Sequence, residues 1–344
     1  MNEPTPVPPS PAASPAASPV ASPAASPALP GIAPVLREIG RGKDGARDLT
    51  RAQAAEVMAR VLDGQVSDVE LGAFAIAMRI KGESPTELAG FMDAVVPRML
   101  PLAPSVALGA ATAGAIVLPS YNGARKLPNL VPLLAALLVR RGLCVLVHGL
   151  EEDPGRVTTA AVFEALGWPV VPDGAGVETS WRRGLPAFIA TGDLHPSLTR
   201  LLQVRRVIGL RNPAHSLAKL LPAVPGAVRV VNHTHPAYAD SLGEFLQLTQ
   251  ATALLMRGTE GEPVADARRC PRLAAVLRGV PEETLSVPAQ EGSLAVLPEL
   301  PKSIDATTTA RFIEDVLGDT YAVPRPIALQ VDALERIALA MRDA

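Results

Sequence analysis

The chain has 344 residues, of which 48% are hydrophobic but only 3% aromatic, so it can bury large aliphatic cores. A formal net charge of −2 excludes a globally basic protein, and any surface for nucleic acid must come from local clustering of cations. Two isolated cysteines, Cys144 and Cys270, indicate a reducing, cytoplasmic environment. No apolar run reaches the ~18 residues of a membrane helix and no secretion signal opens the chain, so we expect no membrane partner.

The first hundred residues divide into a tail and a helical domain. Residues 1–30 repeat Pro, Ala and Ser with too little apolar surface to offset the entropy of ordering, which predicts a disordered tail. Residues 31–104 are predicted to form a small all-helical domain, because apolar residues recur there at helical spacing after residues that cap helices. The predicted helices are 51–62 (after Thr50 or Asp48), 69–80 (after Ser67) and 85–99 (after Ser84). Ser67 with Glu70, and Ser84 with Glu87, have the spacing of a capping box.

From residue 105 onwards, strand-like and helix-like segments alternate. The predicted strands are 113–118, 143–147, 187–191, 227–231 and 253–256. The predicted helices are 130–141, 158–166, 196–222 with a break at Asn212-Pro213, and 329–342. This alternation favours a mostly parallel sheet with helices on its faces. The fold class is therefore α/β, with a small helical N-terminal domain and a larger α/β domain over residues 105–193 and 223–344.

Several motifs resemble one superfamily of transferases. The segment Ser67–Gly90, with Lys81-Gly82-Glu83 within it, looks like the helical domain of anthranilate phosphoribosyltransferases and pyrimidine-nucleoside phosphorylases. Segments 163–167 and 204–211 look like the anthranilate enzyme, which belongs to glycosyltransferase family 3. The resemblance covers roughly residues 31–344. It implies a helical domain hinged to an α/β domain, helices from about 194–222 that return to the helical domain, and a dimer through the helical domains.

The chemistry of that family needs three devices, and this sequence departs from each. Where a glycine-rich loop would bring backbone N–H groups close to a pyrophosphate, the chain has Ser120–Gly123. The phosphate-holding Lys-His-Gly-Asn-Arg segment is replaced by Val147–Glu151, followed by Glu152 and Asp153, which would repel an anion. Asn232–His235 stands where the family has an Asp-Glu pair for magnesium. We therefore expect no catalytic residue, no metal and no cofactor.

A narrower resemblance comes from segments 118–129, 205–213 and 257–263, which look like the YbiB-type relatives of anthranilate phosphoribosyltransferase. That resemblance implies a non-enzymatic homodimer that binds nucleic acid largely without sequence specificity. The alternative is an active anthranilate phosphoribosyltransferase-like glycosyltransferase with an altered phosphate loop. A module that recruits another cytoplasmic protein through the helical dimer is a third possibility, compatible with the first.

The charge pattern agrees with a polyanionic partner. Residues 194–239 contain no Asp or Glu, although they carry several cations and four of the five histidines. Such a stretch gives a positive band that attracts single-stranded DNA or RNA. Alternatively, some of these arginines pair with acids elsewhere or cap helix C-termini. The predicted nucleic-acid-binding residues are Arg125, Lys126, Arg200, Arg205, Arg206, Arg211 and Lys219.

The loop that begins near Leu118 leaves two interpretations open. Arg125 and Lys126 lie beside the expected helix N-terminus at Asn129 or Leu130, where they would attract a phosphate, or else they are solvated cations. Tyr121 either stacks on a base or fills the vacated substrate cleft.

Two further motifs receive structural interpretations. Glu260 and Glu262 flank Gly261 at a predicted strand end, and we expect them to order their loop by pairing with Arg268 or Arg269. The two histidines of Asn232–His235 have a spacing that suits a metal, but no carboxylate or cysteine lies nearby. A loop that contributes to the basic surface is the favoured interpretation.

Overall fold

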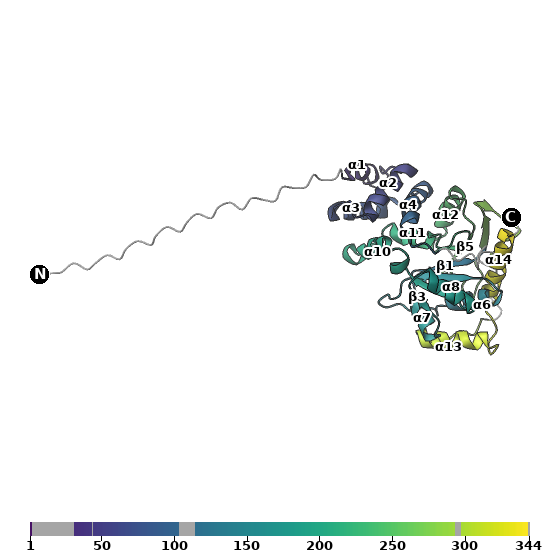
Figure 1. The fold of residues 1–344 in the computed structure, drawn as a ribbon. Coiled ribbons are helices and arrows are strands. Elements are labelled where there is room, and N and C mark those ends of the chain that lie inside the picture. The colour runs from purple at the N-terminus through teal and green to yellow at the C-terminus, as the bar shows by residue number, and fades with distance from the viewer. Residues whose placement is uncertain (2–30, 43, 103–113, 293–296, 343–344) are drawn as a thin grey trace.

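The computed structural model describes residues 1, 31–42, 44–102, 114–292 and 297–342. The predicted tail over residues 1–30 lies, apart from Met1, outside these ranges. Figure 1 shows a group of helices from the N-terminal part beside a larger body that contains the sheet. The N-terminal helices are α1 (Ala33–Ile39), α2 (Arg51–Leu62), α3 (Asp68–Lys81), α4 (Pro85–Val95) and the short 3-10 helix η1 (Val96–Arg98).

Capping side chains fix where the N-terminal helices begin. Thr50, Ser67 and Ser84 each accept a hydrogen bond from the backbone three residues later, and the side chain at that position bonds back to the cap. All three predicted helices are confirmed, with starts that agree within one residue. α4 ends before the predicted residue 99 because Pro97 has no N–H to continue the helical bonding.

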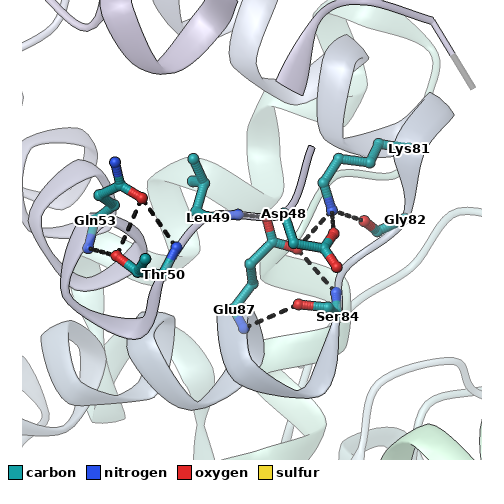
Figure 2. A network of polar contacts seen from close by, with 8 residues as sticks. All are labelled: Asp48, Leu49, Thr50, Gln53, Lys81, Gly82, Ser84 and Glu87. Carbon is teal, nitrogen blue, oxygen red and sulfur yellow. Dashed lines mark hydrogen bonds and ion pairs between the residues drawn. The ribbon is translucent and has the colours of Figure 1, made fainter. Parts of the chain in front are cut away.

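A buried ion pair holds the corner between α3 and α4 (Figure 2). Lys81 Nζ lies 2.6 Å from Glu87 Oε2 and also contacts Asp48, and the Glu87 side chain is fully buried. The second Glu87 oxygen accepts the backbone N–H of Leu49 at 2.9 Å. These bonds tie the start of α2 to the corner, so Lys81–Glu83 has a structural role within the helical part.

The sheet has eight strands in the order β3-β4-β2-β1-β5-β6-β7-β8. The strands from β3 to β6 run parallel, and β7 and β8 are antiparallel additions at one edge. The bounds are β1 Ile116–Ser120, β2 Val145–Gly149, β3 Val170–Val171, β4 Ala187–Ala190, β5 Val228–His233, β6 Ala253–Arg257, β7 Leu273–Leu277 and β8 Val280–Pro281. All five predicted strands are present (residue 113 of the first lies outside the described part), and the predicted fold class is confirmed.

Helices cover both faces of this sheet. They are α6 Val131–Arg140, α7 Thr159–Ala165, α8 Gly174–Arg182, α9 Thr191–Leu194, α10 Pro196–Ile208, α11 Ala214–Leu217, η3 Ala218–Leu220, α12 Ala237–Leu248, α13 Ala306–Leu317 and α14 Arg325–Arg342. The sequence did not predict α8, α12 or α13. In the described ranges, no helix has the length and apolar character needed to cross a bilayer.

Alternate residues of β1 face two different apolar cores. Val117 belongs to a core that also contains the N-terminal helices, α10 and α11, whereas Ile116 and Leu118 face a core built with α6, α7, α13 and α14. The first core is continuous from the helical part to one face of the sheet. Helix α10 contributes to it directly: His195, at its N-cap, lies 3.0 Å from the carbonyl of Val95.

Candidate functional site

A cavity of about 440 Å³ lies between the helical part and the carboxyl end of β5. One side comes from α3, the following corner and α4, and includes Met78, Arg79, Glu83 and Leu88. Another comes from α11, η3 and the loop before them, and includes Arg211, His215 and Lys219. The rest comes from Val231–His235 and α12. Segments far apart in the sequence therefore meet at one site.

Positive charge gathers around Arg211 at this cavity. Burial, together with the like charges of Arg205, Arg156 and Arg79, lowers the pKa of Arg211. Arg79 and Arg211 both line the cavity, and the acid Asp153 opposes the effect of the like charges on Arg211 only weakly. Within the ranges described, none of these four arginines has an acidic partner within 4 Å. We call Arg79, Arg156, Arg205 and Arg211 the arginine cluster.

Lys219 connects the cavity to the loop after β1. Its Nζ donates a hydrogen bond to the carbonyl of Gly261 at 3.0 Å. Burial lowers the pKa of Lys219 to about 8, although the nearby carboxylate of Glu262 acts in the opposite direction. Lys219 is therefore still protonated for the most part at neutral pH, and it loses this charge in mildly alkaline solution.

The loop after β1 is bound by a carboxylate of its own chain. One oxygen of Glu262 accepts the backbone N–H groups of Asn122 at 2.6 Å and Gly123 at 2.8 Å. The other oxygen accepts the hydroxyl of Ser120. Glu262 is 2% exposed, so water does not compete for these bonds.

Glu260 binds the next part of the same loop. Its carboxylate accepts three further backbone N–H groups at 3.0 to 3.1 Å, from Arg125, Lys126 and Leu127. Successive backbone N–H groups form the concave surface that binds anions in many proteins. Here five such groups already donate to the carboxylates of Glu260 and Glu262, so none of the five is left open for a phosphate.

Gly261 allows both acids to reach the loop. Its φ is +87°, and a Cβ on this residue would lie 1.9 Å from the amide nitrogen of Asn122. A larger residue would be strained at this φ and would displace the side chain of Asn122.

The predicted partners of Glu260 and Glu262 are wrong. Arg268 pairs with Asp266 at 2.7 Å, and Arg269 donates to backbone carbonyls of residues 290 and 292. The acids bond instead to backbone N–H groups more than 130 residues away in the sequence. The available signal was the acid-Gly-acid pattern itself, since a loop without its glycines still has N–H groups that need acceptors.

Tyr121 is buried, which contradicts the base-stacking interpretation. Its hydroxyl lies 2.7 Å from Nδ1 of His148, and both side chains are buried. Burial raises the pKa of Tyr121 and lowers that of His148 to about 3, so both groups stay neutral. Tyr121 is therefore not available to stack on a base.

Three of the seven predicted binding residues lie at the cavity or its cluster. Arg205 belongs to the arginine cluster, while Arg211 and Lys219 line the cavity. Arg211 also donates to the side-chain oxygen of Asn122 at 2.9 Å. Arg206, next to Arg205 in the last turn of α10, is exposed.

The other three predicted residues lie elsewhere. Arg200 donates to the carbonyl of Leu62, the last residue of α2, which is the helix-capping role considered as an alternative. Arg125 and Lys126 expose their side chains on the loop that Glu260 holds. Sequence reasoning missed Arg79 and Arg156, because each lies outside the acid-free stretch and reaches the cluster only through the fold.

The comparisons with known proteins agree with this architecture. Residues 33–99 match the helical bundle domain of a glycosyl transferase family. The structure of anthranilate phosphoribosyltransferase from Thermus thermophilus superposes with a TM-score of 0.66 and 21% identity, over 90% of this chain and 93% of that one. The anthranilate phosphoribosyltransferase of Methanopyrus kandleri is 28% identical over 66% of this chain and 65% of its own length. The class is therefore a protein with a phosphoribosyltransferase-like scaffold.

A further relative gives a narrower assignment. The YbiB protein of Escherichia coli K12 is 40% identical over 299 residues, which cover 86% of this chain and 91% of that relative. The chain therefore belongs to the YbiB family.

Proposed function

We propose that this protein is a non-enzymatic homodimer that binds single-stranded DNA or RNA mainly through the phosphates. The observation that carries the proposal is the arginine cluster, whose members have no acidic partner within 4 Å in the described chain. Cations of this kind favour a polyanion because binding releases the counterions of the strand. Since phosphates carry no sequence information, such binding discriminates weakly between sequences.

The carboxylate-filled loop supports a function other than phosphoribosyl transfer. A pyrophosphate that used the backbone N–H groups of Asn122 and Gly123 would have to displace Glu262 from a buried site. It would also meet the carboxylate of Glu260, which three further backbone N–H groups of the loop hold in place. The loop thus supports neither close approach nor charge stabilisation of an anionic substrate.

An exposed apolar surface supports the homodimer. Val69, Ile76 and Ile80 follow one side of α3 and are 82%, 41% and 56% exposed. Figure 1 shows α3 and α10 at the same end of the molecule. Apolar side chains gathered in this way are typical of an interface. A second copy on this surface would bring two arginine clusters toward one continuous groove.

Binding of a labelled single-stranded oligonucleotide at several salt concentrations tests the proposal. We expect the logarithm of the affinity to fall linearly with that of the salt concentration, by about 0.7 per phosphate contacted. Replacing Arg205 and Arg206 together by Glu should lower the affinity at least about tenfold and reduce the slope by about 1.4. The control is Arg311→Glu, which changes an exposed arginine on α13, a helix that Figure 1 shows away from α10. Binding that survives the double reversal, or ignores salt, would contradict the proposal.

Calorimetry tests the enzymatic alternative. Titration with phosphoribosyl pyrophosphate and magnesium should release no heat above dilution, because the loop after β1 is occupied by Glu260 and Glu262. A micromolar dissociation constant would show that the carboxylates yield to this substrate, and the transferase function would then replace ours.

A further inference from the structure

We propose that the cavity between the two parts receives one nucleotide of the bound strand, with its base at the end of β5 and its phosphate at the arginine cluster. This inference rests on the proposed function, and it names what that function does with the cavity. Three features of the site support it: its shape and lining, an unsatisfied polar group, and the position of its charge.

The size and lining of the cavity suit a planar, partly apolar ligand. Its volume of about 440 Å³ lies within the range of roughly 300–1,000 Å³ typical of small-molecule sites. Met78, Leu88 and Leu242 offer apolar surface from three different helices. Phosphates would make no favourable contact with these apolar side chains, whereas the faces of a base would pack against them.

A buried acceptor without a partner indicates that the ligand carries an N–H donor. Asn232 lines the cavity and is 4% exposed, and its Oδ1 has no hydrogen-bond partner within the described structure. The orientation of this amide is fixed, because Nδ2 donates to the carbonyl of Gly261 at 2.6 Å. The edge of every common base offers an amino or imino N–H, whereas an ionised phosphate offers none.

The charges around the cavity are arranged for one phosphate at its opening. Arg79, Arg211 and Lys219 line it, and the neighbouring Arg205 extends the positive charge onto the exposed end of α10. Glu83 also lines the cavity, and burial raises the pKa of its carboxyl, which favours the uncharged form there. A strand that crosses α10 can therefore keep its backbone on the arginines while one base turns inward.

Fluorescence of 2-aminopurine tests this arrangement. A short oligonucleotide carries the probe at one position at a time, because emission rises when the probe leaves the base stack. With the full-length protein we expect emission to rise at least twofold at one position, together with protection from quenching by acrylamide. Asn232→Leu, which removes the acceptor, should reduce both effects while the strand still binds.

Two more variants distinguish the loss of the cavity from a general disturbance of α12. Ser241→Trp on α12 fills the cavity and leaves Asn232 unchanged, so it should abolish the emission change and weaken strand binding only a few-fold. Leu248→Trp lies at the exposed C-terminal end of the same helix, outside the lining of the cavity, and should behave like the wild type. An emission change that persists unaltered in Ser241→Trp would overturn the inference.

The outcomes also separate this inference from the proposed function. If the strand binds with strong salt dependence but no probe position responds, the inference fails and the proposed function stands. If no strand binds, the proposed function itself fails. A titration with adenosine monophosphate addresses a free nucleotide: tight binding of this probe without any response from the strand would assign the cavity to a soluble ligand and overturn the inference.

Discussion

Lys81 and Glu87 form an ion pair from which water is excluded, whereas most ion pairs of the described chain lie at the surface. Burial by itself lowers the pKa of Lys81, but the hydrogen bonds that its ammonium donates to Asp48 and Glu87 outweigh this effect, so the pKa is raised. The folded pKa therefore exceeds the unfolded one. The contribution to stability is complete below the unfolded pKa and is lost as the pH rises through the folded pKa.

Replacing Lys81 by Met should therefore lower the free energy of unfolding by about 3–5 kcal/mol, because Glu87 would remain buried without a counter-charge. Urea denaturation at neutral pH measures this effect. The control is Arg41→Gln, which removes an exposed pair with Glu38 and should cost less than about 1 kcal/mol. Equal losses in the two variants would show that the buried pair has no special role.

The lowered pKa of Lys219 predicts how nucleic-acid binding depends on pH. Lys219 loses its proton near pH 8 in the free protein, and a bound phosphate would raise that pKa, so binding takes up a proton above pH 8. The affinity for an oligonucleotide should fall about tenfold between pH 7 and pH 9. Lys219→Met should bind more weakly at pH 7 and show a flatter profile. An equally steep profile in this variant would assign the proton to another group.

At the scale of elements, the loop after β1 and the segment Glu260–Glu262 act as one unit. Glu262→Ala should expose the backbone N–H groups of Asn122 and Gly123, so their hydrogen exchange should become at least about tenfold faster, the equivalent of ~1.4 kcal/mol of lost local stability. Inorganic pyrophosphate should restore part of this protection in the variant and have no effect on the wild type.

The matched control for that experiment is Glu283→Ala, since Glu283 is exposed and lies at the edge hairpin. Exchange in the loop should stay at the wild-type rate. If pyrophosphate protects the wild-type loop as well, then the carboxylates do not block it, and the argument against a phosphate ligand loses its basis.

The apolar side of α3 makes a prediction about assembly. Replacing Ile76 and Ile80 by Asp should turn a dimer into a monomer, because two charged groups would enter an apolar interface. Light scattering after size-exclusion chromatography measures the mass. Leu339→Asp on α14 changes an apolar residue that is 48% exposed elsewhere and should leave the dimer intact. A monomeric wild type would refute the homodimer directly.

Local signals explain which elements were predictable. The helices α2, α3 and α4 each begin with a capping box, which lies within four residues of sequence.

The hairpin between β7 and β8 also carried a signal in the sequence, which was missed when the strands were predicted. Arg278 and Gly279 both have positive φ, 47° and 83°, as a tight two-residue turn between antiparallel strands requires. The Gly at the second position is the typical mark of such a turn.

The candidate site was less predictable than the fold, because its contacts are remote in sequence. The acid-free stretch located Arg205, Arg211 and Lys219, since charge composition is visible in a window. Composition could not show that Arg229 and His195 of the same stretch are buried structural groups. Nor could it show which acids face which loop, because strand order and interdomain packing decide that.

For the whole molecule, a net charge of −2 conceals an uneven distribution. The like charges of Arg79, Arg156 and Arg205 act on Arg211, and none of these four forms an ion pair within the described ranges, whereas Arg141 is paired with Asp332 and Glu335. An acidic isoelectric point therefore does not argue against a nucleic-acid partner. If the affinity for nucleic acid falls steeply with salt although the net charge is so small, the cations that bind it must be clustered on one part of the surface.

The carboxylates of Glu260 and Glu262 also have a consequence for competition in a crowded solution of metabolites. A loop of open N–H groups would attract sugar phosphates, pyrophosphate and free nucleotides, each in competition with a polymer. Because the chain supplies its own anions, these small molecules can meet only the cations, which bind a single phosphate weakly and a row of them together. A protein that binds as we propose would therefore prefer a strand to its single building blocks.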